Sequence, residues 1–151
     1  MPGVLEGMNV RALALAAWFL CAVAVAAPPG GATLPQKEWT TIRKVIGDQL
    51  VALKAGDGTK ALTYAAPGIR EQLGTPDNFM RMVREGYGAL LAARSTQFLE
   101  GAVIEDAIVQ PLRLVLPDDS VVVALYQMQK QSNGQWRIAG CWIAPSTVQS
   151  T

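Results

Sequence analysis

The stretch VVVALYQMQKQSNGQWRIAGCWI, residues 121–143, predicts a β-hairpin near the end of the chain. Two runs with the residue content of strands, Val121 to Gln129 and Gln135 to Ile143, flank the pair Asn133-Gly134. Asn-Gly is a strong two-residue hairpin signal because both residues accept a positive φ. Two antiparallel strands joined by a tight turn are therefore expected here.

Two further strands are expected upstream, near Thr96 to Ile104 and Ile108 to Leu116. The segment Pro117 to Ser120 has the composition of a tight turn and leads into the strand that starts at Val121. Strands joined in succession by short turns pair with their neighbours in the chain. The sequence thus predicts a curved four-stranded antiparallel meander.

The region before the strands has a helical pattern. Apolar residues recur at three- and four-residue steps from Gln36 until Gly56, with charged residues on the opposite side. Asp57 is expected to cap a shorter helix through Ala65, and residues 68–73 could form one more turn. Thr75-Pro76-Asp77 is a strong helix start, and Gly86 is its natural stop. Residues 88–94 fit either a helical turn or a loop.

Helices followed by hairpin-linked strands predict an α+β fold, in which N-terminal helices pack on one face of the antiparallel sheet. The chain of 151 residues is long enough for one domain and too short for two. We expect that domain to span residues 36–145. A flexible Pro/Gly-rich leader at 27–35 is expected before it, and a disordered tail at 146–151 after it.

The N-terminus has the layout of a signal peptide. Arg11 precedes an uncharged apolar run that is shorter than the roughly 18 to 20 residues of a membrane span. The run ends in Ala24-Val25-Ala26, which is the A-x-A kind of site that signal peptidase accepts. We therefore expect residues 1–26 to be cleaved off and the domain to be exported, to a periplasm or out of the cell. Cleavage after Ala27, an uncleaved anchor and a start at Met8 are the alternatives.

Composition excludes several classes of function. Thirteen Lys and Arg against twelve Asp and Glu give a net charge of +1, which disfavours binding to nucleic acid or to a membrane surface. The chain has no histidine, so the commonest general base and metal ligand is missing. Cys21 is expected to leave with the signal peptide, and Cys141 then has no partner for an internal disulfide. We expect no metal and no cofactor.

Three strings carry a family resemblance: Ala65-Ala66-Pro67-Gly68-Ile69-Arg70, the segment Phe79 to Tyr87, and Gly134-Gln135-Trp136-Arg137-Ile138-Ala139-Gly140-Cys141. They resemble the bacterial domain-of-unknown-function family 4864, and the order of elements resembles the cone-shaped NTF2-like (cystatin-like) superfold. The resemblance implies a small exported domain with a pocket between helices and sheet. It names no substrate, because NTF2-like folds include isomerases, dehydratases and pure binding modules.

Six residues are candidates for lining such a pocket. The tyrosine hydroxyls could donate hydrogen bonds, the arginines could bind a carboxylate or phosphate, and the thiol could be reactive beside an arginine. Each also has a structural interpretation: tyrosines as core rings, the cysteine as an inert core residue, and the strand arginine in an ion pair with Asp77 or Glu71. The candidates are Tyr64, Arg70, Tyr87, Tyr126, Arg137 and Cys141.

Strict alternation along the last strand places Cys141 on one face with Arg137, and Trp136 on the other face with Trp142. The two tryptophans are interface candidates if their common face is exposed. Gly140, in the middle of this strand, suggests a bulge or a bend.

Three hypotheses for function follow. The leading one is a non-enzymatic domain that binds a small or apolar ligand between helices and sheet. The alternative is an interaction module that uses the sheet face for a partner protein or for a homodimer. The third is an enzyme that uses a tyrosine and a carboxylate for acid–base chemistry.

Overall fold

The computed structural model describes residues 33–146. The predicted signal peptide, most of the predicted leader and residues 147–151 lie outside this range. The described part begins with five helices, namely α1 (Gln36–Lys54), α2 (Gly58–Thr63), α3 (Pro67–Leu73), α4 (Pro76–Gly86) and α5 (Gly88–Ala92). Five strands follow: β1 (Ser95–Phe98), β2 (Ala102–Ile104), β3 (Ala107–Val115), β4 (Val121–Lys130) and β5 (Trp136–Pro145). The α+β fold class is confirmed.

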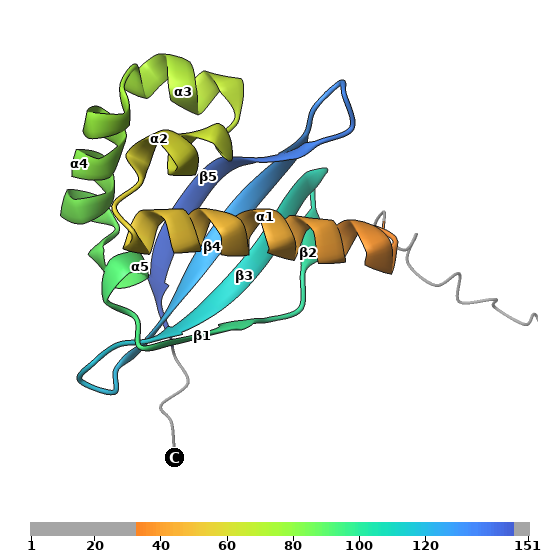
Figure 1. The fold of residues 1–151 in the computed structure, drawn as a ribbon. Coiled ribbons are helices and arrows are strands. Elements are labelled where there is room, and N and C mark those ends of the chain that lie inside the picture. Colours follow the sequence, from red (N-terminus) through yellow and green to blue (C-terminus); the bar gives the residue numbers. More distant parts are fainter. Residues whose placement is uncertain (1–32, 147–151) are drawn as a thin grey trace, which may run out of the picture. The chain divides into compact units, whose positions relative to one another are not determined.

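The strands form one antiparallel sheet in the order β1-β3-β4-β5, and β2 pairs with the other end of β3. Helix α1 crosses one face of this sheet, and the shorter helices gather beside it on the same side (Figure 1). Within the described residues, no helix is long and apolar enough to cross a membrane.

The predicted helix starts are confirmed by their caps. The Asp57 side chain accepts a hydrogen bond from the backbone N–H of Lys60, and Thr75 accepts one from the N–H of Asn78. Pro76 occupies the first position of α4, where its missing N–H costs nothing. The ambiguous residues after Tyr87 form the short helix α5.

The strand predicted at Thr96 to Ile104 is two strands, so the sheet has five strands and not four. The break at residues 99–101 has a packing reason. A Cβ atom on Gly101 would overlap the ring of Trp39 from α1, so the chain passes directly beneath this indole. The Leu99 carbonyl accepts a hydrogen bond from the buried Gln110 side chain, at 2.8 Å.

Two hairpin turns differ from expectation. The β4–β5 connection spans residues 131–135, and of the Asn133-Gly134 pair only Gly134 has a positive φ, at 83°. The two-residue turn lies instead between β2 and β3, where Glu105 and Asp106 have φ values of 48° and 69°. No glycine or asparagine marks this turn in the sequence.

The core lies between α1 and the sheet. Helix α1 contributes a buried stripe that includes Ile42, Ile46 and Leu50, and the strands contribute alternate residues. The strand residues of the core are Leu112, Leu114, Ala124, Tyr126, Met128, Trp136 and Ile138.

A β-bulge reverses the alternation halfway along β5. Gln127 pairs with Gly140 but Met128 pairs with Ile138, which leaves Ala139 as an extra residue. Before the bulge Trp136 points into the core and is 4% exposed, whereas after it Trp142 points outward and is 53% exposed. The predicted pairing of Trp136 with Trp142 on one face, and of Cys141 with Arg137 on the other, is therefore wrong.

Candidate functional site

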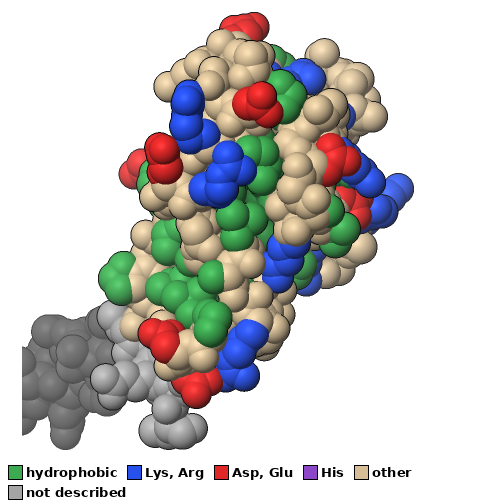
Figure 2. Space-filling view, turned by 60° about the vertical axis from the view of Figure 1, so that its left-hand side comes forward, with side chains coloured by type: hydrophobic (Ala, Val, Ile, Leu, Met, Phe, Trp, Pro, Cys, Tyr) green, Lys and Arg blue, Asp and Glu red, His purple; other side chains and the backbone are tan. Residues whose placement is uncertain are grey.

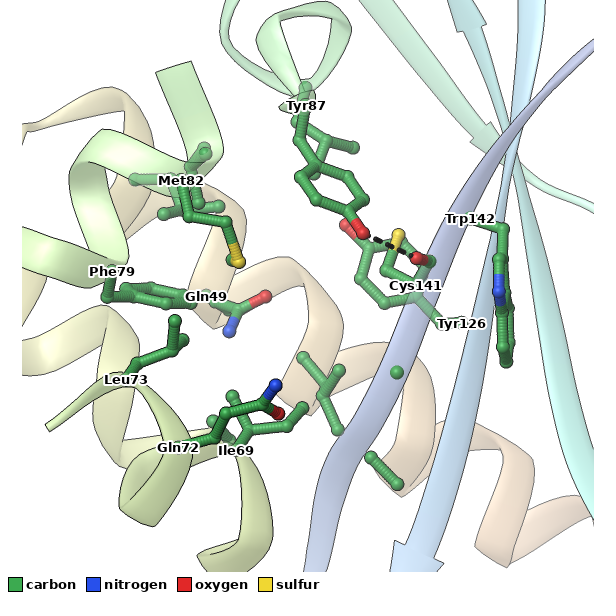
Figure 3. A pocket seen from close by; sticks show the side chains of 17 residues that line it. Gln49, Ile69, Gln72, Leu73, Phe79, Met82, Tyr87, Tyr126, Cys141 and Trp142 are labelled. Atoms are coloured by element: carbon green, nitrogen blue, oxygen red, sulfur yellow. Dashed lines mark hydrogen bonds between the residues drawn. The ribbon is translucent and has the colours of Figure 1, made fainter. Parts of the chain in front are cut away.

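A cavity of about 340 Å³ lies between the helices and the end of the sheet formed by β4 and β5. Figure 3 shows the side chains of α1, α3 and α4 on one side of this space and those of β4 and β5 on the other. Most of the lining is apolar, and the helices contribute Leu53, Ile69, Leu73, Phe79, Met82, Val83 and Leu90.

The polar groups at the cavity are all uncharged. The lining residues with polar side-chain atoms are Gln49, Gln72, Tyr87, Tyr126, Cys141 and Trp142. Among the described residues that line the cavity there is no Lys, Arg, Asp or Glu. The cavity is therefore suited to a neutral molecule, because an ionised group would lose its hydration there without gaining a counter-charge.

Tyr126 lies on the sheet side of the cavity. Its side chain projects from β4 toward the helices and is 1% exposed (Figure 3). Its hydroxyl is the only buried side-chain polar atom of residues 33–146 that has no hydrogen-bond partner. Burial raises the pKa of Tyr126 well above its ordinary value, so the phenol stays protonated.

Tyr87 closes the space between α4 and β5. Its hydroxyl donates a hydrogen bond to the backbone carbonyl of Cys141, with an oxygen–oxygen distance of 3.0 Å (Figure 3). Burial raises the pKa of the Cys141 thiol to about 12. At neutral pH this thiol is protonated, which favours its interpretation as an inert core residue over a reactive one.

Gln49 and Gln72 are polar cavity residues that sequence reasoning did not single out, and Gln49 is the buried one of the two. It is buried in α1, and its amide nitrogen donates to the carbonyl oxygen of Ala61 at 3.2 Å. Its amide projects into the space between α4 and β5 (Figure 3). The signal in the sequence was an amide at an inward position of the apolar stripe, and it could have been used.

The other pocket candidates lie elsewhere. Tyr64 and Arg70 do not line the cavity, and Arg70 is exposed on α3. Arg137 lies opposite Gln129 and donates to the Trp136 carbonyl and the Gln135 side chain. It forms no ion pair with Asp77 or Glu71.

Trp136 has a structural role in this arrangement. Its indole N–H donates to the Glu38 carboxylate at 2.5 Å, and Lys130 donates to the other oxygen of the same carboxylate. The Lys130 ammonium also lies over the Trp136 ring, 5.7 Å from its centroid. These contacts join the first turn of α1 to the β4–β5 hairpin.

An open groove adjoins the cavity between α3 and α4. Gln72, Leu73 and Met82 line both spaces, and Arg81 and Glu85 line the groove alone. The space-filling view that brings the α4 side forward shows hydrophobic side chains running down the middle of this face between charged ones (Figure 2). The groove and the cavity are therefore adjacent, with these three residues between them.

No group of three or more His, Cys, Asp or Glu side chains within residues 33–146 is arranged to hold a metal ion. The described residues that line the cavity can offer a ligand hydrogen bonds and apolar contacts.

These features define a class of protein: a small α+β domain whose helices cover one face of an antiparallel sheet and enclose a largely apolar, uncharged cavity. The chain belongs to the family described as "Domain of unknown function (DUF4864)", which matches residues 35–151. Comparison with curated proteins and with solved structures gave no match. The family relationship is thus shown, and the likeness to the NTF2-like superfold stays a prediction.

Proposed function

We propose that this domain binds a small, neutral and largely apolar molecule in the cavity between its helices and β5. The observation that carries the proposal is the cavity of about 340 Å³ with an apolar, uncharged lining. Ligand pockets are typically clefts of about 300–1,000 Å³, lined mainly by hydrophobic side chains with a few placed polar groups.

The enzyme hypothesis has less support. Two tyrosines line the cavity, but none of the described residues lining it has a carboxylate. A tyrosine–carboxylate pair for proton transfer needs both groups within hydrogen-bond reach of one substrate. Binding is the role that the lining supports best.

The proposal is tested with N-phenyl-1-naphthylamine, a neutral apolar fluorophore, titrated into the folded domain. Binding in the cavity is expected to increase the fluorescence of the probe. Leu73→Trp enlarges a half-buried side chain that lines the cavity, so this increase is expected to be smaller in the variant. Val51→Trp adds an indole at a position of α1 that is 68% exposed and is not part of the lining, and is the matched control. No saturable binding by the unmodified domain would overturn the proposal.

A second candidate function rests on the outer face of the sheet. Pro111, Leu125 and Trp142 lie side by side on β3, β4 and β5, on the face that α1 does not cover. Arg113 and Arg137 lie on the same face at either side of this apolar row. An apolar centre with a polar rim is the composition of a protein interface, and a two-fold axis through the row would bring it against itself.

We propose a second copy of the chain as the occupant of this face. Trp142→Ser is expected to shift the sedimentation equilibrium toward monomer, because it removes the 53% exposed indole from the row. Val51→Ser, on the exposed side of α1, is the control and should leave the equilibrium unchanged. A wild-type domain that stays monomeric at high concentration would rule out this second role.

We also propose that the domain works outside the cytoplasm, after export. The support is the signal-peptide layout of the first residues, with Ala24-Val25-Ala26 as the cleavage site. The denaturing mass of protein recovered from the exported fraction is expected to start at Ala27. A full-length mass in that fraction would favour the uncleaved anchor.

A further inference from the structure

Two other polar side chains of the cavity already have partners of their own. The Tyr87 hydroxyl donates to the Cys141 carbonyl, and the Gln49 amide nitrogen donates to Ala61. The Tyr126 hydroxyl is the one buried side-chain polar atom of residues 33–146 without a hydrogen-bond partner, on a side chain that is 1% exposed and lines the cavity. An unpaired buried hydroxyl is costly, so native proteins rarely keep one without a reason.

Resting on the proposed function, we propose that the ligand carries a neutral hydrogen-bond acceptor, such as a ketone, ester or ether oxygen, that binds the Tyr126 hydroxyl. Tyr126 is then the residue that sets specificity. It discriminates against hydrocarbons of the same shape, which would leave its hydroxyl unpaired.

The acceptor must be neutral for two reasons. None of the described residues that line the cavity is a cation. An ionised carboxylate would therefore lose its hydration without gaining an ion pair. The buried phenol stays protonated at neutral pH and can therefore donate. An uncharged oxygen satisfies the hydroxyl without bringing a charge into the cavity.

The position of Tyr126 also orients the ligand. Tyr126 pairs with Cys141 in the sheet, on the far side of the cavity from the helical residues that it shares with the open groove. Gln72, Leu73 and Met82 line both spaces. The ligand is thus oriented with its acceptor end at Tyr126 and its apolar end toward the groove between α3 and α4.

Three naphthalene probes of matched shape test the inference: 2-acetylnaphthalene, 2-isopropenylnaphthalene and 2-naphthoate. The first two differ in a C=O against a C=CH₂ group, and the third adds a negative charge. Dissociation constants are measured by calorimetry for the wild-type domain, Tyr126→Phe and Tyr64→Phe. Tyr64 lies outside the lining, so its variant controls for the loss of a tyrosine hydroxyl elsewhere.

The wild type is expected to bind the ketone about tenfold more tightly than the alkene. Tyr126→Phe should abolish this preference while the affinity for the alkene stays the same, and Tyr64→Phe should behave as wild type. The carboxylate should bind more weakly than the ketone.

The outcomes separate the two proposals. If Tyr126→Phe keeps the preference for the ketone, the acceptor inference is overturned, while binding of the alkene still supports the proposed function. Tightest binding by the carboxylate would overturn the neutral acceptor in particular. If the wild type binds none of the three probes, the proposed function itself fails.

Discussion

At the scale of single residues, Tyr126 has its ring in the core and its hydroxyl without a partner. Replacing Tyr126 by Phe removes the unpaired group and little else. We expect Tyr126→Phe to raise the free energy of unfolding of the ligand-free domain by about 1 kcal/mol, measured by urea denaturation.

Tyr87→Phe is the matched comparison, because it deletes a hydroxyl that does have a partner, the Cys141 carbonyl. It is expected to lower the free energy of unfolding by about 1 kcal/mol. Equal destabilisation by both variants would mean that the Tyr126 hydroxyl is satisfied in solution, and the argument for a ligand acceptor would lose its basis.

The buried thiol predicts a loss of stability at alkaline pH. Burial raises the pKa of Cys141 to about 12, whereas a thiol in an unfolded chain has a pKa of about 8.5. Between these values the unfolded chain releases a proton that the native chain keeps, so the free energy of unfolding falls as the pH rises.

Urea denaturation at a series of pH values from 7 to 10 checks this dependence, in steps of about one unit. Cys141→Ala is expected to flatten the decline above about pH 8.5, because the titrating group is gone. A variant that declines as steeply as the wild type would show that other groups dominate the alkaline limb.

Residue types alone indicated part of the site. Tyr87, Tyr126 and Cys141 were named from the sequence, and all three line the cavity. Arg137 was not placed correctly by alternation, because the bulge at Ala139 changes which residues share its face. No sequence pattern reveals that one hydroxyl lacks a partner, since that depends on where Tyr87 and Gln49 direct their own donors.

At the scale of elements, the turn between β2 and β3 has an unfavourable sequence. Glu105 and Asp106 both adopt positive φ, a conformation that costs most residues about 1–2 kcal/mol and that Asn and Gly accept more easily. We expect the double variant Glu105→Asn, Asp106→Gly to raise the free energy of unfolding by about 1 kcal/mol in thermal or urea denaturation.

Glu105→Gln serves as its control, since it removes a charge but leaves the backbone conformation unrelieved. It should change stability by less than the double variant. If it stabilises as much, the gain comes from charge and not from the turn.

The starts of two helices could be predicted because the side chains that cap them can be recognised in the sequence. Caps at Asp57 and Thr75 marked helix starts, because their side chains satisfy free N–H groups. No comparable sequence signal predicts that the first predicted strand is divided into β1 and β2. This division depends on the approach of Gly101 to Trp39, a contact between residues far apart in the chain.

At the scale of the whole domain, the contact between Trp39 and Gly101 packs α1 against the segment that joins β1 to β2. The Trp39 ring occupies the space that a side chain at position 101 would need. Gly101→Ala is therefore expected to lower the free energy of unfolding by about 1–3 kcal/mol, because the indole must shift within packed surroundings.

Gly47→Ala provides the opposite case for the same measurement. Gly47 lies within α1, and a Cβ there would meet no atom within 4 Å. The substitution should raise stability by about 0.5–1 kcal/mol through helix propensity. A similar effect of both alanines would show that the Trp39 contact contributes little.

The order of helices and strands could be predicted from the sequence, because the periodicity of apolar residues is a local property of each segment. The cavity was not readable in the same way. It forms where residues of α1, α3, α4, β4 and β5 meet, and its lining depends on a single extra residue in β5.

That extra residue, Ala139, affects β5 as an inserted base affects a coding sequence: everything downstream is read in the other phase. The bulge, and not simple alternation from Trp136, therefore decides the face on which Cys141 and Trp142 lie. Deleting Ala139 would remove the bulge but keep the faces, because simple alternation would then place Trp136 and Cys141 inward and Trp142 outward, as they are now. A homologue that is one residue shorter at this point is therefore expected to keep the same side chains on the pocket face.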